Sequence, residues 1–273
     1  MLIRCRLARV IICAVVIVFS VKITMAAECR QDNFGSWLEQ SKQQAIGLGI
    51  SQQSATSALN GITYDPVIVA RDHSQSVFQQ SFEQFSGRMA SPDRLRKGAN
   101  MLKRYGSILG RIEDRYGVPG EVLVAIWGLE SDYGVNQGKY STIRSLATLA
   151  YDCRRSEKFR TELFDALRII ERGDLNSGQM IGAWAGEIGQ TQFLPSAYLR
   201  FAVDFEGYGH RDLIHSALDA LASTGNYLKS YGWLAGKPWT EGSPNFPVLQ
   251  KWNESEVYAK TVGYFATRLA KEP

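Results

Sequence analysis

The longest helical pattern in the sequence runs from Ser91 to about Tyr116 and stops at an abrupt break, Tyr116–Gly120. Ser91 can cap this helix, and Pro92 suits its first position, where a missing N–H group costs no hydrogen bond. Apolar residues recur along it at helical spacing: Leu95, Leu102, Ile108, Leu109 and Ile112. A second, largely apolar helix is expected over Pro119–Tyr133. This pair indicates a mainly α fold.

The rest of the chain supports that class, because no alternating strand pattern and no internal repeat is persuasive. An extended piece leading into a helix is expected over Asp65–Arg88, and a loop over Gly236–Pro247. Further helices are expected over Phe34–Leu48, Ser51–Leu59, Thr142–Tyr151, Glu157–Arg172, Met180–Ala183, Ser196–Ala202, Leu213–Gly232 and Ser255–Ala270.

The first 26 residues resemble a cleavable export signal. Basic residues precede the apolar run Val10–Val21, and the small residues Ala26 and Ala27 follow where a signal peptidase could cut. An uncut membrane anchor is the alternative, but a run of about a dozen residues is short for a span of roughly 20. Residues 1–26 hold four of the 31 basic residues, so the other 27 balance the 27 acidic ones. A near-neutral mature chain gives no electrostatic case for binding nucleic acid.

Two cysteines, Cys5 and Cys13, lie in this signal, which leaves Cys29 and Cys153 in the mature chain. An even pair in an oxidising compartment predicts a disulfide between the N-terminal segment and the core, and two free thiols are the alternative. Two cysteines cannot build a zinc site alone, and the three histidines are not spaced around them as ligands.

One candidate catalytic residue is Glu130, in the last turn of the apolar helix. Trp127 lies three residues earlier, on the same helical face. The negative end of the helix dipole and the apolar neighbours should both raise the pKa of the carboxyl group, as a general acid requires. A solvated glutamate at a helix end is the alternative, and this stretch alone leaves both open.

A second stretch, Gly182–Pro195, is rich in glycine, amide side chains and aromatic residues, which suits a sugar site. It lacks the glycine spacing of nucleotide-binding loops. With three histidines in the chain, a Ser-His-Asp triad is disfavoured. Four aromatic residues are expected in the core rather than as sugar platforms: Trp184, Phe193, Trp233 and Trp252.

Together, these stretches resemble the lytic murein transglycosylases of the membrane-bound B type, a lysozyme-like family. The resemblance covers nearly all of the mature chain. It rests on several motifs in one order: Tyr116–Pro119, Ala125–Gly134, Ala147–Tyr151, Ala185–Ser196, Val203–Phe205, Trp252–Asn253 and Tyr258–Ala259.

The resemblance implies non-hydrolytic cleavage of the MurNAc–GlcNAc bond of peptidoglycan, which leaves 1,6-anhydro-MurNAc ends. It makes Glu130 the sole catalytic acid/base and Gln192 a residue of the glycan groove. It also implies that Asn253 and Tyr258 contact substrate, while Arg155 falls near an arginine of the family. The expected enzyme is a periplasmic monomer that binds glycan strands, with proteins of the cell-wall machinery as further partners.

The resemblance also implies a lysozyme-like catalytic core with an N-terminal helical region packed on it. The expected parts are a signal peptide over 1–26, the N-terminal helical region over 27–115, the catalytic core over 116–235, and a loop and helix over 236–273 that complete the core.

Two other functions stay open. A hydrolytic muramidase would need a second carboxylate; Asp132 points away from Glu130 on a helix, and Glu187 has no predicted position. A catalytically weak scaffold that binds peptidoglycan is the other. No cofactor is expected. Some relatives hold calcium in the loop that corresponds to Asp204–Asp212, but Tyr208 occupies a ligand position here and strong binding is not expected.

Overall fold

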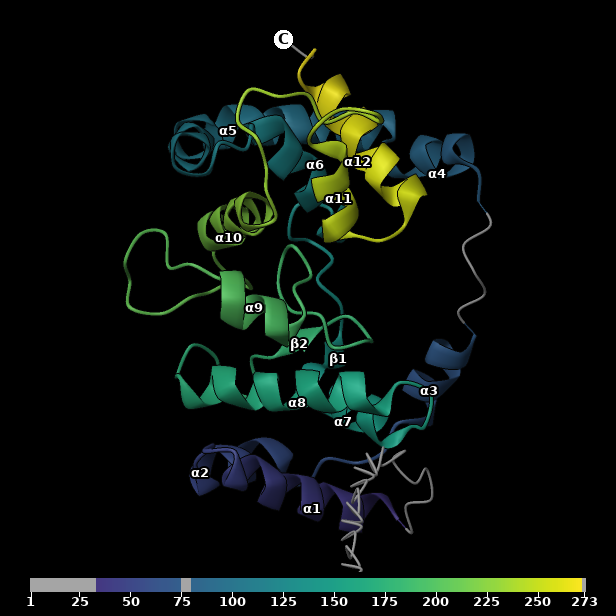
Figure 1. Cartoon of the computed structure of the whole chain (residues 1–273), viewed down its shortest axis with the longest axis vertical. Helices are drawn as coiled ribbons and strands as arrows, with labels where there is room; N and C mark the ends of the chain where they lie inside the picture. Colours follow the sequence, from purple (N-terminus) through teal and green to yellow (C-terminus); the bar gives the residue numbers. More distant parts are fainter. Residues whose placement is uncertain (1–32, 75–79, 272–273) are drawn as a thin grey trace, which may run out of the picture. The chain divides into compact units, whose positions relative to one another are not determined.

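The computed structural model describes residues 33–74 and 80–271, which belong to one compact unit, Gln31–Pro273 (Figure 1). The expected signal peptide and Cys29 lie outside the described residues. The elements follow one another as α1 (Phe34–Gly47), α2 (Gln52–Leu59), α3 (Pro66–His73), α4 (Phe82–Met89), α5 (Pro92–Tyr116), α6 (Gly120–Ser131), β1 (Tyr140–Ser141), α7 (Thr142–Tyr151), α8 (Ser156–Glu171), β2 (Ile181–Gly182), α9 (Pro195–Phe201), α10 (Ala217–Ser230), α11 (Phe246–Trp252) and α12 (Glu256–Leu269).

The mainly α class is confirmed, and local sequence explains the ends of the long helix α5. The Ser91 side chain accepts a hydrogen bond from the backbone N–H of Arg94 at 3.3 Å, and Pro92 fills the first turn. Gly117 ends the helix with a φ of 74°, a left-handed conformation that glycine adopts without steric cost. The chain can therefore turn back at once and pack α6 against α5.

Two hydrophobic clusters organise the helices. The α6 cluster contains buried apolar residues of α4, α5, α6, α10, α11 and α12. The α8 cluster contains those of α1, α2, α3, α7, α8 and α9. Tyr227 on α10 and Trp252 at the end of α11 pack against both clusters. Helix α6 lies within the α6 cluster and is buried along its whole length except at Glu121 and Glu130.

The helix expected over Met180–Ala183 is wrong. Ile181 and Gly182 form β2, which pairs antiparallel with β1 in the register Tyr140 to Gly182. The chain then turns back on itself, with bridges from Gly182 to Ile188 and from Ile188 to Phe193. We call residues 181–193 the β2 hairpin. The paired strand segments of this hairpin are too short to show an alternating apolar pattern in the sequence.

Three other expectations also fail. Pro66–His73 is helical where an extended piece was expected, because Asp65 caps the backbone N–H of Val67 at 3.0 Å and Pro66 suits the first turn. Helix α11 begins inside the segment expected to be a loop, again with a proline in its first turn. Helix α10 begins at Ala217 rather than Leu213, after the cap residue Ser216. The domain boundaries expected from sequence stay predictions.

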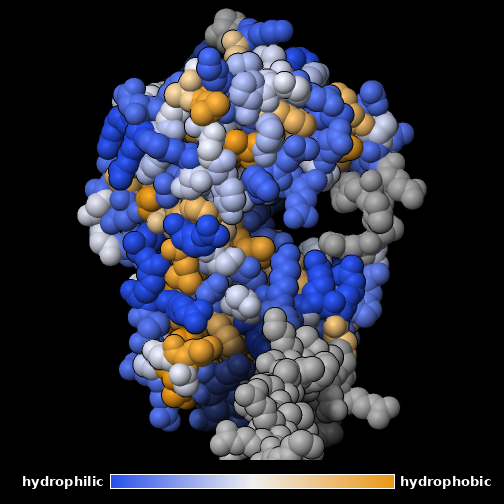
Figure 2. All heavy atoms as spheres, in the orientation of Figure 1, coloured by the Kyte–Doolittle hydropathy of each residue, from blue (hydrophilic) through white to orange (hydrophobic). Residues whose placement is uncertain are grey.

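On the face drawn in Figure 2, hydrophobic residues are interspersed with hydrophilic ones. Within residues 33–74 and 80–271, no helix combines the length and the apolar character needed to cross a bilayer.

Candidate active site

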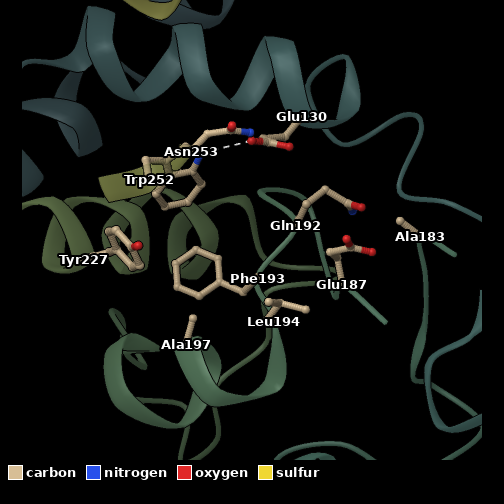
Figure 3. A pocket seen from close by; sticks show the side chains of 10 residues that line it. All are labelled: Glu130, Ala183, Glu187, Gln192, Phe193, Leu194, Ala197, Tyr227, Trp252 and Asn253. Carbon is tan, nitrogen blue, oxygen red and sulfur yellow. Dashed lines mark hydrogen bonds between the residues drawn. The ribbon is translucent and has the colours of Figure 1, made fainter. Parts of the chain in front are cut away.

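A cavity of about 450 Å³ lies where four segments distant in sequence meet: the end of α6, the β2 hairpin with the start of α9, α10, and the end of α11 (Figure 3). Its lining mixes carboxylates, amides and aromatic rings: Glu130, Ala183, Glu187, Gln192, Phe193, Leu194, Ala197, Tyr227, Trp252 and Asn253. The cavity therefore brings together Glu130, Gln192 and Asn253, three of the residues selected from the sequence.

Glu130 is held by two donors. Its Oε1 atom accepts a hydrogen bond from Trp252 Nε1 at 2.9 Å and one from the Tyr258 hydroxyl at 2.5 Å. Burial raises the pKa of the carboxyl group to about 7; the two donated bonds oppose this rise, and the negative charge of Glu187 adds to it. The carboxyl group can thus hold a proton near neutral pH and release it again, as acid/base chemistry requires.

Tyr258 contacts Glu130 from the first turn of α12 rather than lining the cavity itself. Its side chain is only 8% exposed. Burial and the neighbouring negative charge raise its pKa well above the usual value of 10. The phenol therefore stays protonated and always donates to Glu130. Its expected role as a contact of the substrate stays a prediction.

The Tyr258→Phe variant should raise the pKa of Glu130 above about 7, because it removes a donor that stabilises the ionised carboxylate. NMR titration of isotope-labelled glutamate side chains can measure this shift. Tyr264→Phe is the matched control: Tyr264 also lies on α12, but its hydroxyl accepts from Arg268 and does not contact Glu130. A pKa of Glu130 that stays the same in Tyr258→Phe would contradict the role given to this phenol.

Two amide side chains flank the carboxyl group. Gln192 has a φ of 56°, unusual for a residue other than glycine, and its Nε2 atom donates to the carbonyl oxygens of Gly189 and Gln137 at 2.6 and 3.1 Å. The Oδ1 atom of Asn253 accepts from the backbone N–H of Ser255 at 3.0 Å. Both side chains are thus held in fixed orientations at the cavity.

Glu187 had no position predicted from the sequence, and the structure places it on the β2 hairpin in the cavity wall. Its Oε2 atom accepts from the backbone N–H of Ala185 at 3.2 Å. Burial raises its pKa, while backbone N–H groups and the positive charges of Lys158 and Arg155 oppose the rise. No spacing rule relates residue 187 to residue 130, so only the folded hairpin reveals that the two carboxyl groups share one cavity.

Arg155 does not line the cavity. Its guanidinium is ion-paired with Asp72 on α3, which is 1% exposed and also binds Arg154 at 2.8 Å. It also lies 4.8 Å from the centre of the Phe159 ring. Its expected contact with substrate stays a prediction.

Asp72→Asn should lower the free energy of unfolding by about 1–3 kcal/mol, the usual cost of losing buried hydrogen bonds to charged groups. The cost stays below that of a fully buried pair, because both arginines reach solvent. Thermal and urea unfolding measure it. Asp93→Asn removes an exposed pair with Arg96 and should change stability by less than about 1 kcal/mol. Equal effects of the two substitutions would contradict this account.

Trp252 packs against both hydrophobic clusters, and its indole also lines the cavity and donates to Glu130. Phe193 lines the cavity too, at 5.4 Å from the Trp252 ring, and Tyr227 lies 4.9 Å from that ring. Sequence reasoning missed Tyr227. Its place in a helix pattern gave no signal that it faces a cavity.

The expectation that no metal or other cofactor is needed stays a prediction. In the loop Asp204–Asp212, where calcium binding was considered, the Asp204 carboxylate accepts backbone N–H bonds from Gly207, Tyr208 and Gly209. The carboxylates of Asp72 and Asp152 lie near a ring nitrogen of His73, but the arginines on Asp72 oppose a cation there. The expected disulfide stays a prediction, since Cys29 lies outside the described residues.

A profile of the family described as the transglycosylase SLT domain matches residues 33–242. The chain belongs to this family. The domain is 37% identical over 147 residues to membrane-bound lytic murein transglycosylase B of Escherichia coli strain K12. That alignment covers 54% of this chain and 40% of the relative, so the chain matches less than half of that protein's length.

Among solved structures, this SLT domain resembles SltB3 from Pseudomonas aeruginosa in complex with NAG-anhNAM-pentapeptide, with 34% identity and a TM-score of 0.84 over 88% of this chain and 80% of that one. The soluble lytic transglycosylase SltB1 from the same organism shares the fold, with a TM-score of 0.80 at 23% identity over 86% of this chain and 98% of that one. The lysozyme-like, mainly α fold expected from the sequence is therefore confirmed.

Proposed function

We propose that the protein is a lytic transglycosylase that cleaves the β-1,4 bond between MurNAc and GlcNAc in peptidoglycan. The observation that carries the proposal is a protonatable carboxyl group, Glu130, in a cavity walled by aromatic and amide side chains. Aromatic faces stack on sugar rings, and amides bind hydroxyl and acetamido groups. Family membership and the peptidoglycan fragment bound to the related SltB3 support the same substrate class.

In the proposed mechanism, protonated Glu130 donates its proton to the glycosidic oxygen as the bond to C1 of MurNAc breaks. The 2-acetamido group of the substrate stabilises the positive charge left on the sugar. The Glu130 carboxylate then accepts the proton of the C6 hydroxyl, and O6 attacks C1 to close the 1,6-anhydro ring. Glu130 ends protonated again, so one carboxyl group serves both steps and no water is consumed.

The neighbours of Glu130 suit both steps. The donors from Trp252 and Tyr258 occupy the same oxygen, Oε1, and so hold the carboxyl group in one orientation. Because Tyr258 keeps its proton, it cannot remove the one that Glu130 must donate. Gln192 and Asn253 are proposed to bind the sugar substituents beside the scissile bond.

The pH dependence of kcat/KM follows from Glu130. The acid form must donate the proton and predominates below a pKa of about 7. The rate on glycan strands should therefore fall as pH rises above about 7, by roughly tenfold per pH unit. Initial rates in buffers of equal ionic strength measure this limb. A rate that rises across that range would mean that the ionised form starts the reaction.

The test is digestion of purified sacculi by the mature protein, with the products weighed by mass spectrometry. Muropeptides ending in 1,6-anhydro-MurNAc would support the proposal. Products one water heavier would mean hydrolysis. Hydrolysis is the main alternative to the proposed reaction, because the cavity holds a second carboxylate, Glu187. Sacculi that are bound but not cut would favour the scaffold.

The protein is further proposed to act in the bacterial periplasm as a monomer without a cofactor. The signal-like residues 1–26 and the location of the substrate support this placement. Proteins of the cell-wall machinery are the proposed partners.

A further inference from the structure

Two carboxyl groups face one cavity from different parts of the fold. Glu130 enters from the end of α6 and Glu187 from the β2 hairpin on the other side, with Gln192 between them in the view of Figure 3. Both side chains line the same cavity, and the negative charge of Glu187 contributes to the raised pKa of Glu130. The two groups nevertheless make different contacts.

The contacts of Glu187 suit an anion. The backbone N–H of Ala185 donates to the Glu187 carboxylate at 3.2 Å, whereas Glu130 accepts from two side chains, Trp252 and Tyr258. Burial raises the pKa of Glu187, and the positive charges of Arg155 and Lys158 oppose that rise and favour the ionised form. Neither forms an ion pair with Glu187 within residues 33–74 and 80–271, so its charge is not cancelled by contact. The two carboxyl groups can therefore divide the roles of acid and anion.

We propose that Glu187 is a second catalytic carboxylate, which stays ionised while Glu130 carries the proton and stabilises the positive charge that develops on the sugar. This proposal rests on the proposed function. A fixed negative charge in a cavity of low dielectric constant acts strongly on a cationic transition state and needs no rearrangement during the reaction. Glu187 forms no bond to the sugar and transfers no proton, so the chemical balance of the two steps is unchanged.

A purely structural role explains the position less well. The side chain of Glu187 accepts a hydrogen bond from Ala185, two residues away in the same turn. The hairpin already has its own backbone bonds, between Ala183 and Glu187 and between Ile188 and Phe193. A neutral side chain of the same shape would serve that turn equally well, whereas the cavity would lose its second charge.

The decisive variant is therefore Glu187→Gln, which keeps an acceptor for the Ala185 N–H group and removes only the charge. On glycan strands we expect kcat to fall by about 10²-fold, with KM changed by less than about threefold, since the charge acts mainly in the transition state. The products should keep their anhydro ends. Glu157→Gln, which removes an exposed charge paired with Arg160 on α8, should leave kcat unchanged.

A second measurement does not depend on turnover. NMR titration should show a lower pKa for Glu130 in Glu187→Gln than in the wild type, because a neighbouring negative charge is gone. Unchanged kcat together with an unchanged pKa of Glu130 would overturn the proposal. Hydrolysed products that disappear in the variant would also overturn it, because Glu187 would then be a general base for water. A wild-type protein that yields no products at all would contradict the proposed function instead.

Discussion

Glu130→Gln is expected to lower kcat on glycan strands by about 10²- to 10⁴-fold, the range that general acid–base groups contribute. We expect a loss of kcat near the upper end of this range, because one residue both donates and accepts the proton in the proposed mechanism. Glutamine keeps an oxygen that can accept the bonds from Trp252 and Tyr258, so the cavity should keep its shape. Mass spectrometry of digested sacculi would quantify the anhydro products.

The matched control is Glu121→Gln, in the first turn of the same helix and outside the cavity. It should retain wild-type rates. Circular dichroism and thermal unfolding should be alike for both variants and the wild type. Substantial anhydro product from Glu130→Gln would show that another group supplies the proton, and Glu187 would be the first to test.

The second large effect is expected from Gly182→Ala in β2. A Cβ atom at this position would lie 1.8 Å from the carbonyl oxygen of Glu187, and no side-chain rotation can relieve a clash with backbone. The β2 hairpin must therefore shift, and it carries Glu187 and Gln192 into the cavity. We expect a loss of more than about 3 kcal/mol in unfolding free energy. For a chain of this size that lowers Tm by on the order of 10 °C.

Gly106→Ala provides the matched glycine control. Gly106 lies in the middle of α5, and an added Cβ atom meets nothing within 4 Å. Because alanine favours helix, this change should stabilise the protein by about 0.5–1 kcal/mol. A Gly182→Ala variant as stable and as active as Gly106→Ala would mean that the hairpin adapts without cost.

The helices were largely predictable because their ends depend on local chemistry. Ser91 and Pro92 start α5 as expected, and α7 has the bounds expected for it, Thr142–Tyr151. The β2 hairpin was not predictable, since its shape depends on backbone contacts such as that between Gly182 and Glu187. Helix α11 was hidden by the prolines and glycines around it, which are typical of loops.

Part of the site was also predictable, because it depends on local helix chemistry. The last-turn position of Glu130 and its apolar helix indicated a raised pKa, and burial does raise it. Gln192 and Asn253 line the same cavity as Glu130, and their contacts with substrate stay predictions. Arg155 lies outside the lining because buried Asp72 binds it, and Glu187 lies inside because a hairpin brings it there. Such placements depend on tertiary contacts that spacing does not encode.

The two aromatic rings that pack against both hydrophobic clusters have a consequence for when activity can arise. Tyr227 and Trp252 form part of the cavity wall, so neither the α6 cluster nor the α8 cluster can shape that wall alone. Trp252 also holds Glu130, which ties the acid to the same junction. A partly folded chain, with only one cluster assembled, has no competent site. On the proposed function, an enzyme able to damage the wall of its own cell is harmless until its folding is complete.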